Sequence, residues 1–484
     1  MTNQKTLPTT PLARTGIMAI VGFLAFSEIV SGFLQSWYAP VLSMLGERLD
    51  TNAAQLNWVS ASYLLASVVF VPLLAKLGDL YGHKKMVLIV LTTVVVGTIV
   101  TAVATTFPMF VLGRVIQGAL GALLPLEMAI IRERSGDRAA SGIGILVGCL
   151  GAGAAIGTLL VGFLGTFLPL AAILLVPGAL TLLALVLIAL TVPETTIRSQ
   201  GSIDWKGATL LGLGLALTLF AVSNGRAYGW TSPLIIFLIL VGIAACIAFV
   251  RVERRVKSPL VDIDLVTRGG VGFFLLLMLL FGAQFYGSGS VNSLFAAAKP
   301  DTAGYGFGLD SLGVSLTLLP SSAMLMVGAF IGAPLVRRFG QARVLWVSNL
   351  LVVAKYVMVM LFNDNLSVFF AAQFVGGFGI GIFVAIMPAI VVGLAPKDSS
   401  GIAGAMYNTS RTLSGALGGA LFAGVMSAMF LPGTSVPSLG AFLTVWAICG
   451  GLSVVIMVIL PLGRKITARA ESPAEPTLKT SEVH

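Results

Sequence analysis

The sequence predicts an all-α integral membrane protein made of two six-helix bundles with a pair of helices inserted between them. Of its 484 residues, 57% are hydrophobic and only 10% are charged, and the mean hydropathy is +1.00. A soluble domain has about 25% charged residues because its surface must be hydrated. The apolar residues form long runs, and parts of the chain recur at a nearly constant offset. These observations exclude a soluble globular protein of this size.

Fourteen apolar runs are long enough to be membrane-spanning helices. A helix needs about 20 apolar residues to cross a hydrocarbon core about 30 Å thick, whereas a barrel strand needs only about 10. The expected spans are 16–45, 56–76, 86–106, 108–131, 140–163, 167–192, 206–224, 232–251, 271–298, 311–334, 344–362, 366–394, 401–430 and 438–461. The first run is far longer than the apolar region of a signal peptide, so we expect it to stay in the membrane.

The positions of lysine and arginine predict the orientation. If the N-terminus is cytoplasmic, the outward loops contain only Arg48, Arg226 and Lys299, and nearly all other basic residues outside the spans lie on the cytoplasmic side. This bias is typical of cytoplasmic loops. We therefore expect both termini to be cytoplasmic in the cell membrane, and the net charge of +10 needs no nucleic-acid partner.

The residue types that bind metals or act as nucleophiles are scarce. The three cysteines, Cys149, Cys246 and Cys449, lie inside apolar runs, which predicts neither a disulfide framework nor a zinc site. The sequence has two histidines and no Gly-Lys dipeptide, which a phosphate-binding loop requires. We therefore expect no enzyme, no cofactor and no metal.

An internal repeat relates the two halves of the chain. The matched positions are Gly82 with Gly340, Arg114 with Gln373, Gly118 with Gly377, and 141–143 with 400–402. Because six plus two spans is an even number, both bundles enter the membrane in the same direction, and parallel repeats of this kind place a ligand site between them.

The repeat also divides the chain into segments. We expect a cytoplasmic N-terminus at 1–15, an N-terminal six-helix bundle at 16–192, a linker with the two inserted helices at 193–270, a C-terminal six-helix bundle at 271–461, and a cytoplasmic tail at 462–484. The tail is polar and contains two prolines, so we expect it to be disordered.

Glu28 and Arg114 are charges inside predicted spans. At 1.5 Å per residue, Glu28 lies about 12 Å from the outer face and Arg114 about 9 Å below it. A buried carboxylate at such a depth is costly unless it is paired or protonated. We expect Glu28 to alternate between carrying a proton and pairing with Arg114; the alternative is a permanent structural ion pair.

Three other charges have different expected roles. Arg411 lies at mid-depth and either lines a cavity, which would favour anionic or zwitterionic substrates, or bonds carbonyl groups between helices. Lys355 lies at a similar depth, and because its long stem can reach the interface we expect a structural role. We expect Glu127 at the inner surface, in a salt bridge with Arg132 and Arg134.

Polar and aromatic residues inside the spans are candidates for a substrate cavity. They are Gln35, Trp37, Tyr38, Tyr63, Gln117, Gln284, Tyr286, Asn292, Gln373, Asn408 and Arg411. Several lie near span ends, where aromatic belts also occur, so for Trp37 an interfacial position is an equal alternative.

Small residues recur along one predicted helix. The predicted span 140–163 contains two pairs of glycines, Gly144 with Gly148 and Gly153 with Gly157, and the two members of each pair are four positions apart. Glycines so spaced let two helices approach closely. We expect tight packing there, or a helix that bends or slides during transport.

Two motifs resemble those of the major facilitator superfamily, and specifically of its drug:proton antiporter family with fourteen spanning helices. One is Gly78-Asp79-Leu80-Tyr81-Gly82-His83-Lys84-Lys85, and the other is Arg114-Val115-Ile116-Gln117-Gly118. The resemblance implies a major-facilitator-type fold. It also implies that Asp79, Gly82, Lys84 and Lys85 form a gating loop that closes the inner face against Ser400–Gly401, and that Arg114 acts in proton transfer.

The same resemblance implies the function. We expect a proton-coupled secondary transporter that exports amphipathic small molecules such as drugs or natural products, which would confer antibiotic resistance, and we expect a monomer. The family's helix 5 signature is incomplete, since Gly153-Ala154-Ala155-Ile156-Gly157-Thr158 lacks its proline. The alternative is therefore an uptake symporter or facilitator of the same fold for a small organic solute.

Overall fold

The computed structural model describes residues 11–471 except 57, 136–138, 196–203, 257–258, 260–269 and 395–399. Nearly all of the described chain is helical, and its β-structure consists of one isolated bridge between Phe430 and Pro437. The all-α membrane class is therefore confirmed. The expected disordered tail is wrong over 462–471, which form the end of a helix, and its remaining residues, 472–484, lie outside the described part of the chain.

The helices follow one another with short connections. The N-terminal group is α1 (Pro11–Trp37), η1 (Ala39–Val41), α2 (Leu42–Leu49), α3 (Ala53–Leu56), α4 (Trp58–Tyr81), α5 (His83–Val103), α6 (Phe107–Gln117), η2 (Gly118–Ala122), α7 (Leu123–Ser135), α8 (Ala139–Leu164) and α9 (Leu170–Thr191). The inserted pair is α10 (Trp205–Tyr228) and α11 (Pro233–Glu253). The C-terminal group is α13 (Val271–Ala297), α14 (Pro300–Ala303), α15 (Ser311–Phe339), α16 (Gln341–Leu361), α17 (Leu366–Leu394), α18 (Ser400–Ala428) and α19 (Leu439–Glu471).

Within the described residues, 12 helices are long and apolar enough to cross a membrane. The other two predicted spans coincide with α8 and α18, whose side chains are only partly described. The count of fourteen therefore stays a prediction. Two spans extend beyond their predicted ends, because α2 continues the first to Leu49 and α7 continues the fourth to Arg134.

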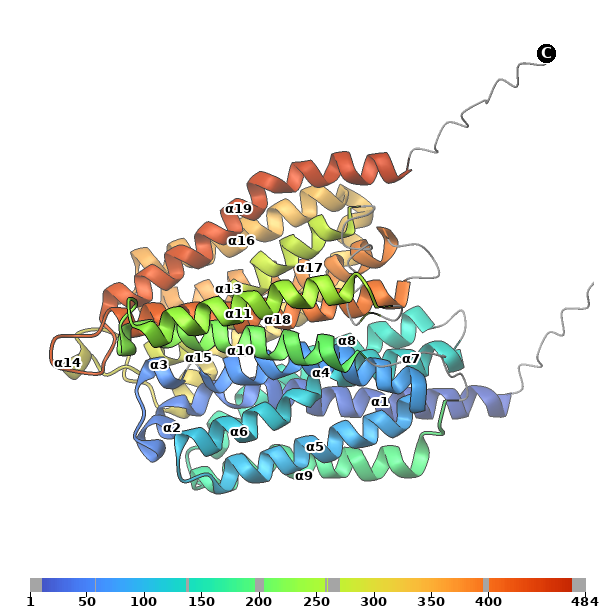
Figure 1. Ribbon diagram of the computed structural model, residues 1–484, viewed down its shortest axis with the longest axis horizontal. Coiled ribbons are helices and arrows are strands. Elements are labelled where there is room, and N and C mark those ends of the chain that lie inside the picture. Colours follow the sequence, from blue (N-terminus) through green and yellow to red (C-terminus); the bar gives the residue numbers. More distant parts are fainter. Residues whose placement is uncertain are drawn as a thin grey trace, which may run out of the picture.

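The buried apolar residues form two large clusters, one in the N-terminal group of helices and one in the C-terminal group. Figure 1 shows these groups on opposite sides of the molecule, in blue to turquoise and in yellow to red, with α10 and α11 running along them in green. Contacts of α4 with α18 and of α8 with α15 join the two groups. The functional site has to be sought between them.

The two ends of the bundle differ in charge. Helix α1 begins and α19 ends at the same end (Figure 1). That end also has Lys84 and Lys85 at the start of α5, and Arg337 and Arg338 at the end of α15. We call it the basic end. The tight turns there, between α4 and α5 and between α15 and α16, contain Gly82 and Gly340, a pair that the repeat matches. Their φ angles are +115° and +82°, which residues with a side chain rarely adopt.

Helices α1 and α8 lie in direct backbone contact through glycines. A methyl group added to Gly153 would overlap the main chain at Ile29, and one added to Gly157 would lie 2.7 Å from the Phe33 carbonyl oxygen. Gly148 instead faces Phe330 of α15, at 3.4 Å. The surroundings of Gly144 lie outside the described side chains.

This contact predicts a sharp effect of Gly153→Ala on stability. Because the added methyl group has no room, the variant should be destabilised by about 1–3 kcal/mol, the usual cost of overpacking. Thermal unfolding of the purified protein in detergent measures it. Gly22→Ala is the matched control, since no atom lies within 4 Å of its added methyl group. Equal melting temperatures for the two variants would contradict the packing.

Candidate transport cavity

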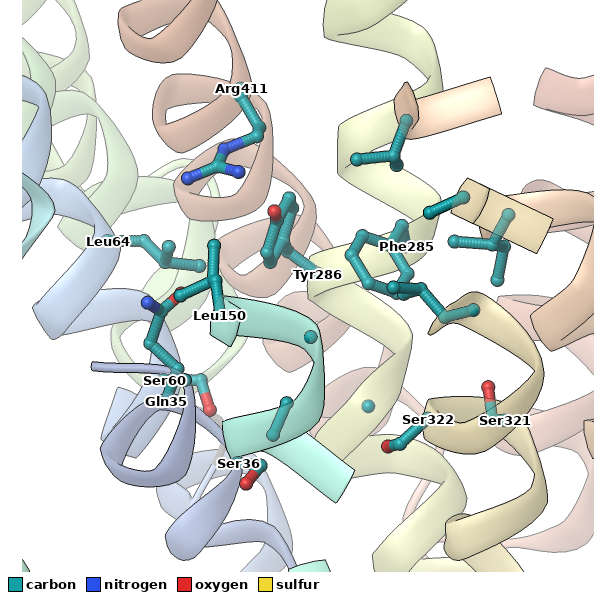
Figure 2. Close-up of a pocket in the computed structure, with 18 of the residues that line it drawn as sticks. Gln35, Ser36, Ser60, Leu64, Leu150, Phe285, Tyr286, Ser321, Ser322 and Arg411 are labelled. Carbon is teal, nitrogen blue, oxygen red and sulfur yellow. The ribbon is translucent and has the colours of Figure 1, made fainter. Parts of the chain in front are cut away.

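A cavity of about 410 Å³ lies between the two groups of helices. Figure 2 shows side chains converging on it from both sides, with Gln35 and Ser60 from the N-terminal group and Tyr286, Ser321 and Arg411 from the C-terminal group. The predicted cavity residues that line it are Gln35, Tyr63, Tyr286, Asn292, Gln373, Asn408 and Arg411.

Four of the residues predicted to line the cavity do not line it. Trp37 donates its indole hydrogen to the Ile173 carbonyl oxygen at 3.1 Å and is fully buried against α9. Gln284 donates to the Ser453 hydroxyl at 2.9 Å, toward α19. Tyr38 and Gln117 bond each other inside the N-terminal group, with their closest polar atoms 2.9 Å apart. Their polarity indicated burial in the bundle, but it did not indicate which helix face they occupy.

Arg114 is held by neutral groups. Its Nε donates to the Val59 carbonyl oxygen at 2.7 Å, and its Nη1 donates to Gln117 Oε1 at 2.6 Å. The guanidinium also lies over the rings of Tyr38 and Tyr63, 4.1 and 4.7 Å from their centres. Carbonyl oxygens and aromatic faces both attract a cation, so this charge is met without a carboxylate.

The predicted pairing of Glu28 with Arg114 is therefore wrong. Glu28 interacts with Glu127, and Glu127 lies thirteen residues after Arg114 in the span Phe107–Arg134, about 20 Å further along that span toward the basic end. Neither Glu28 nor Arg114 takes part in an ion pair with a described residue.

Glu28 instead lies beside Glu127. Both side chains are fully buried, the two carboxyl groups interact directly, and the Ser27 hydroxyl donates to Glu127. Neither oxygen of Glu28 accepts a hydrogen bond from a described donor. The expected salt bridge of Glu127 with Arg132 and Arg134 is therefore also wrong: Glu127 faces the interior.

A small second pocket connects this carboxyl pair with the main cavity. Glu28 lines it together with Gln35, Tyr63 and Arg411, and these last three also line the main cavity. Arg411 comes from α18, in the opposite group of helices, and its charge acts on Glu28. Figure 2 shows Arg411 reaching toward Leu64, and its guanidinium lies 5.7 Å from the centre of the Tyr286 ring.

Lys355 lines the cavity as well, which the expected structural role did not anticipate. Its side chain is only 3% exposed. The stem passes along α17 at Gly376, and the ammonium lies 5.5 Å from the centre of the Tyr356 ring. Its depth was known from the sequence, but its direction toward the cavity was not.

Contacts between the two groups of helices also occur at the end opposite the basic end. There the Ser293 hydroxyl donates to the Ala39 carbonyl oxygen, and the Ser311 hydroxyl lies 3.1 Å from Met44 Sδ. In the other direction the lining extends to Arg132 near the end of α7 and to Gly404 near the start of α18. The lining therefore extends toward the basic end.

The predicted gating loop is held by an acid that the sequence analysis did not single out. The backbone N–H groups of Lys84 and Lys85 each donate to the Glu194 carboxylate at 3.0 Å. A carboxylate at a helix N-terminus stabilises the unpaired N–H groups there. Asp79 contacts His83 at 3.1 Å. Its predicted contact with Ser400–Gly401 falls outside the described side chains.

A comparison with protein-family models decides the classification. The model described as Major Facilitator Superfamily matches residues 24–419. The chain belongs to this superfamily. It is therefore a multi-pass membrane transporter and not an enzyme.

Curated relatives include transporters with different cargoes. The chain is 28% identical to a uridine/deoxyuridine transporter of Lactococcus lactis, over 78% of this chain and 82% of that protein. It is 26% identical to a probable actinorhodin transporter of Streptomyces coelicolor, over 82% and 71% of the two chains. It is 24% identical to the multidrug efflux pump LfrA of Mycolicibacterium smegmatis, over 89% and 85%.

Solved structures agree on the fold. The nucleoside transporter NupG matches with a TM-score of 0.63 and 16% identity, over 92% of this chain and 99% of that one. The human organic anion transporter MFSD10 matches with a TM-score of 0.64 and 16% identity, over 93% and 100%. At such identities the likeness establishes the major facilitator fold alone.

The capping of α5 by Glu194 predicts the effect of Glu194→Ala. Without the carboxylate, two N–H groups at the start of α5 lose their acceptor, and the variant should lose about 1 kcal/mol of stability. Hydrogen exchange of the Lys84 and Lys85 amides, with thermal unfolding, measures this. Glu47→Ala, an exposed acid on α2, is the control. Unchanged exchange at the start of α5 would contradict the capping.

Proposed function

We propose that this protein is a proton-coupled transporter that exports amphipathic small molecules across the cell membrane by alternating access. The observation that carries the proposal is the buried pair Glu28 and Glu127, which connects with the cavity through the small pocket. The bias in basic residues supports a cytoplasmic basic end. The cavity then extends toward the cytoplasm, the side from which an exporter loads its cargo.

The carboxyl pair has the chemistry of a proton carrier. Two touching carboxylates that are fully buried would repel each other, and burying even one charge without a partner is costly. A proton on one of them removes a charge and lets the pair share a hydrogen bond. The proton can leave only when water or a cation stabilises the negative charge of the carboxylate that remains.

Arg411 is that cation. It faces Glu28 through the small pocket and belongs to the opposite group of helices. When Glu28 is ionised, the attraction draws α18 toward α1; when Glu28 is protonated, the attraction is lost. A proton thereby changes the packing between the two groups, which is the two-state element that alternating access requires. Arg411 thus replaces Arg114 as the proposed partner of Glu28.

The lining of the cavity suits an amphipathic cargo. Apolar side chains such as Leu64, Leu150 and Phe285 alternate with hydroxyl and amide groups such as Ser322 and Gln35 (Figure 2). Cavities of this kind bind the body of a ligand by apolar contact and orient it with a few polar groups. One proton moving down a potential of about 100 mV supplies about 2.3 kcal/mol. That is enough for a cargo gradient of about 50-fold.

Uptake is the second candidate function. It is favoured by the similarity to the uridine/deoxyuridine transporter and by the absence of proline from the glycine-rich segment of α8. The actinorhodin and multidrug relatives favour export.

Glu28→Gln should abolish proton-driven transport, because the amide can neither release nor accept the proton. The variant should still insert and fold, since glutamine has the shape of the protonated acid. Efflux of two fluorescent dyes from energised cells, the cation ethidium and the anion 8-anilinonaphthalene-1-sulfonate, with the amount of membrane protein measured in parallel, tests this. Glu47→Gln serves as the control. Undiminished efflux by Glu28→Gln would exclude the proton role.

The direction of transport is tested in inverted membrane vesicles. An exporter should accumulate the dye inside such vesicles when protons are pumped inward, and a protonophore should release it. Dye that instead leaves preloaded inverted vesicles in a proton-dependent way would establish the uptake alternative. Dye equilibration without proton dependence would indicate a facilitator.

A further inference from the structure

We propose that Lys355 and Gln373 form a binding site for an acidic group, so that the cargo is an amphipathic organic anion. The inference rests on the proposed function in that the cavity is the place where cargo binds. It does not depend on the direction of transport.

The charges on the described cavity wall have one sign. Arg114, Arg132, Lys355 and Arg411 line it, and none of the described lining residues is Asp or Glu. Glu28 lies apart, in the small pocket. Arg114 is already engaged by Val59 and Gln117, so its charge is largely met. The other cations leave the main cavity with an excess of positive charge, which attracts an anion.

Two hydrogen-bond donors on this wall have no acceptor among the described residues. The Lys355 side chain is 3% exposed and lines the cavity, and its ammonium makes no hydrogen bond or ion pair with a described residue. Gln373 is 1% exposed, and its Nε2 has no partner either. Buried polar groups are nearly always bonded, and an unmet one is costly. Both of these groups donate, so the missing partner is an acceptor.

The two donors lie close together. The Lys355 stem packs on α17 at Gly376, where the absence of a side chain leaves room for it. Gln373 is three residues earlier on α17, which places it on the same helix face one turn away. Lys355 is about 9 Å from the end of α16 and Gln373 about 10 Å from the start of α17, so they are level. A carboxylate, with two oxygens, can accept from both.

The wall next to this donor pair is apolar. Ile380 and Val384 follow Gln373 along the same face of α17 toward the basic end, and Leu325 lines the cavity from α15. An acidic group at Lys355 therefore leaves the rest of the molecule against aliphatic side chains. A ligand that fits both parts has one acidic group on an apolar body.

Equilibrium binding to the purified full-length protein in lipid nanodiscs tests the site. The probes are naphthalene-1-acetate, its neutral amide and 1-naphthylmethylammonium, which share one ring system and differ in charge. The acid should bind about tenfold more tightly than the amide, as expected for a charge-assisted hydrogen bond, and the ammonium most weakly. Lys355→Met should remove most of the preference, leaving only the weaker attraction of the remaining cavity cations, and should leave amide binding unchanged.

Two further variants make the result specific to the donor pair. Lys355→Arg should retain the preference for the acid, and Gln373→Leu should reduce it. Lys299→Met is the matched control, because Lys299 is an exposed cation outside the cavity, and it should change nothing. An amide that binds as tightly as the acid, no binding of the acid, or an unchanged preference in Lys355→Met would each overturn the proposal.

The binding assay separates this inference from the proposed function. Glu28→Gln should keep the preference for the acid, because Glu28 does not line the main cavity. If the preference is found but transport does not depend on protons, the proton mechanism alone fails. If proton-driven efflux of cationic dyes is found and the acid is not preferred, the anion site alone fails.

Discussion

A charge buried in the membrane-spanning part of the chain has to be stabilised by other groups of the protein, and the rest of the structure depends on which groups do this. Arg114 is met completely, by a carbonyl oxygen, an amide and two aromatic rings. Glu28 lies against a second carboxyl group, and this pair is stable only when the two groups share a proton. Lys355 is met by no described side-chain acceptor. The interactions of Arg114 are structural. Glu28 and Lys355, in contrast, each lack a partner that a proton or a cargo can supply.

The fold could be predicted from the sequence because the bilayer fixes one length. Apolar runs of about 20 residues identify helices whatever their packing. The repeat could be recognised because the turns at Gly82 and Gly340 both need a positive φ angle, which favours glycine. The ends of the spans were less predictable. The helices continue past the last residues that a count of apolar residues includes, as α2 does over 46–49.

The site was harder to predict, because a sequence gives depth along a helix and not the direction of a side chain. Subtracting the depth of Glu28 from a core about 30 Å thick places it level with Arg114, although the run 16–45 would be about 45 Å long as one helix. Trp37 has the residue type and depth of a cavity residue but faces α9. For Lys355 we predicted a structural role, because the long side chain of lysine can reach the membrane interface. Its stem instead packs in the space left by Gly376 and leads into the cavity. Only the packing of neighbouring helices carries this information.

The separation of the two proposed sites bears on how a proton and a cargo can be exchanged. A cationic cargo would compete with the proton for Glu28 directly, whereas an anion would bind best when Glu28 is protonated, which favours co-transport. Direct coupling of either kind requires contact, yet Glu28 lines only the small pocket, and Lys355 and Gln373 line only the main cavity. Coupling would then pass through the interface between the two groups of helices, where α18 packs against α4 and Arg411 responds to the charge of Glu28. Since a membrane potential that is negative inside already drives an anion outward, export of such a cargo needs the proton chiefly to reset this packing.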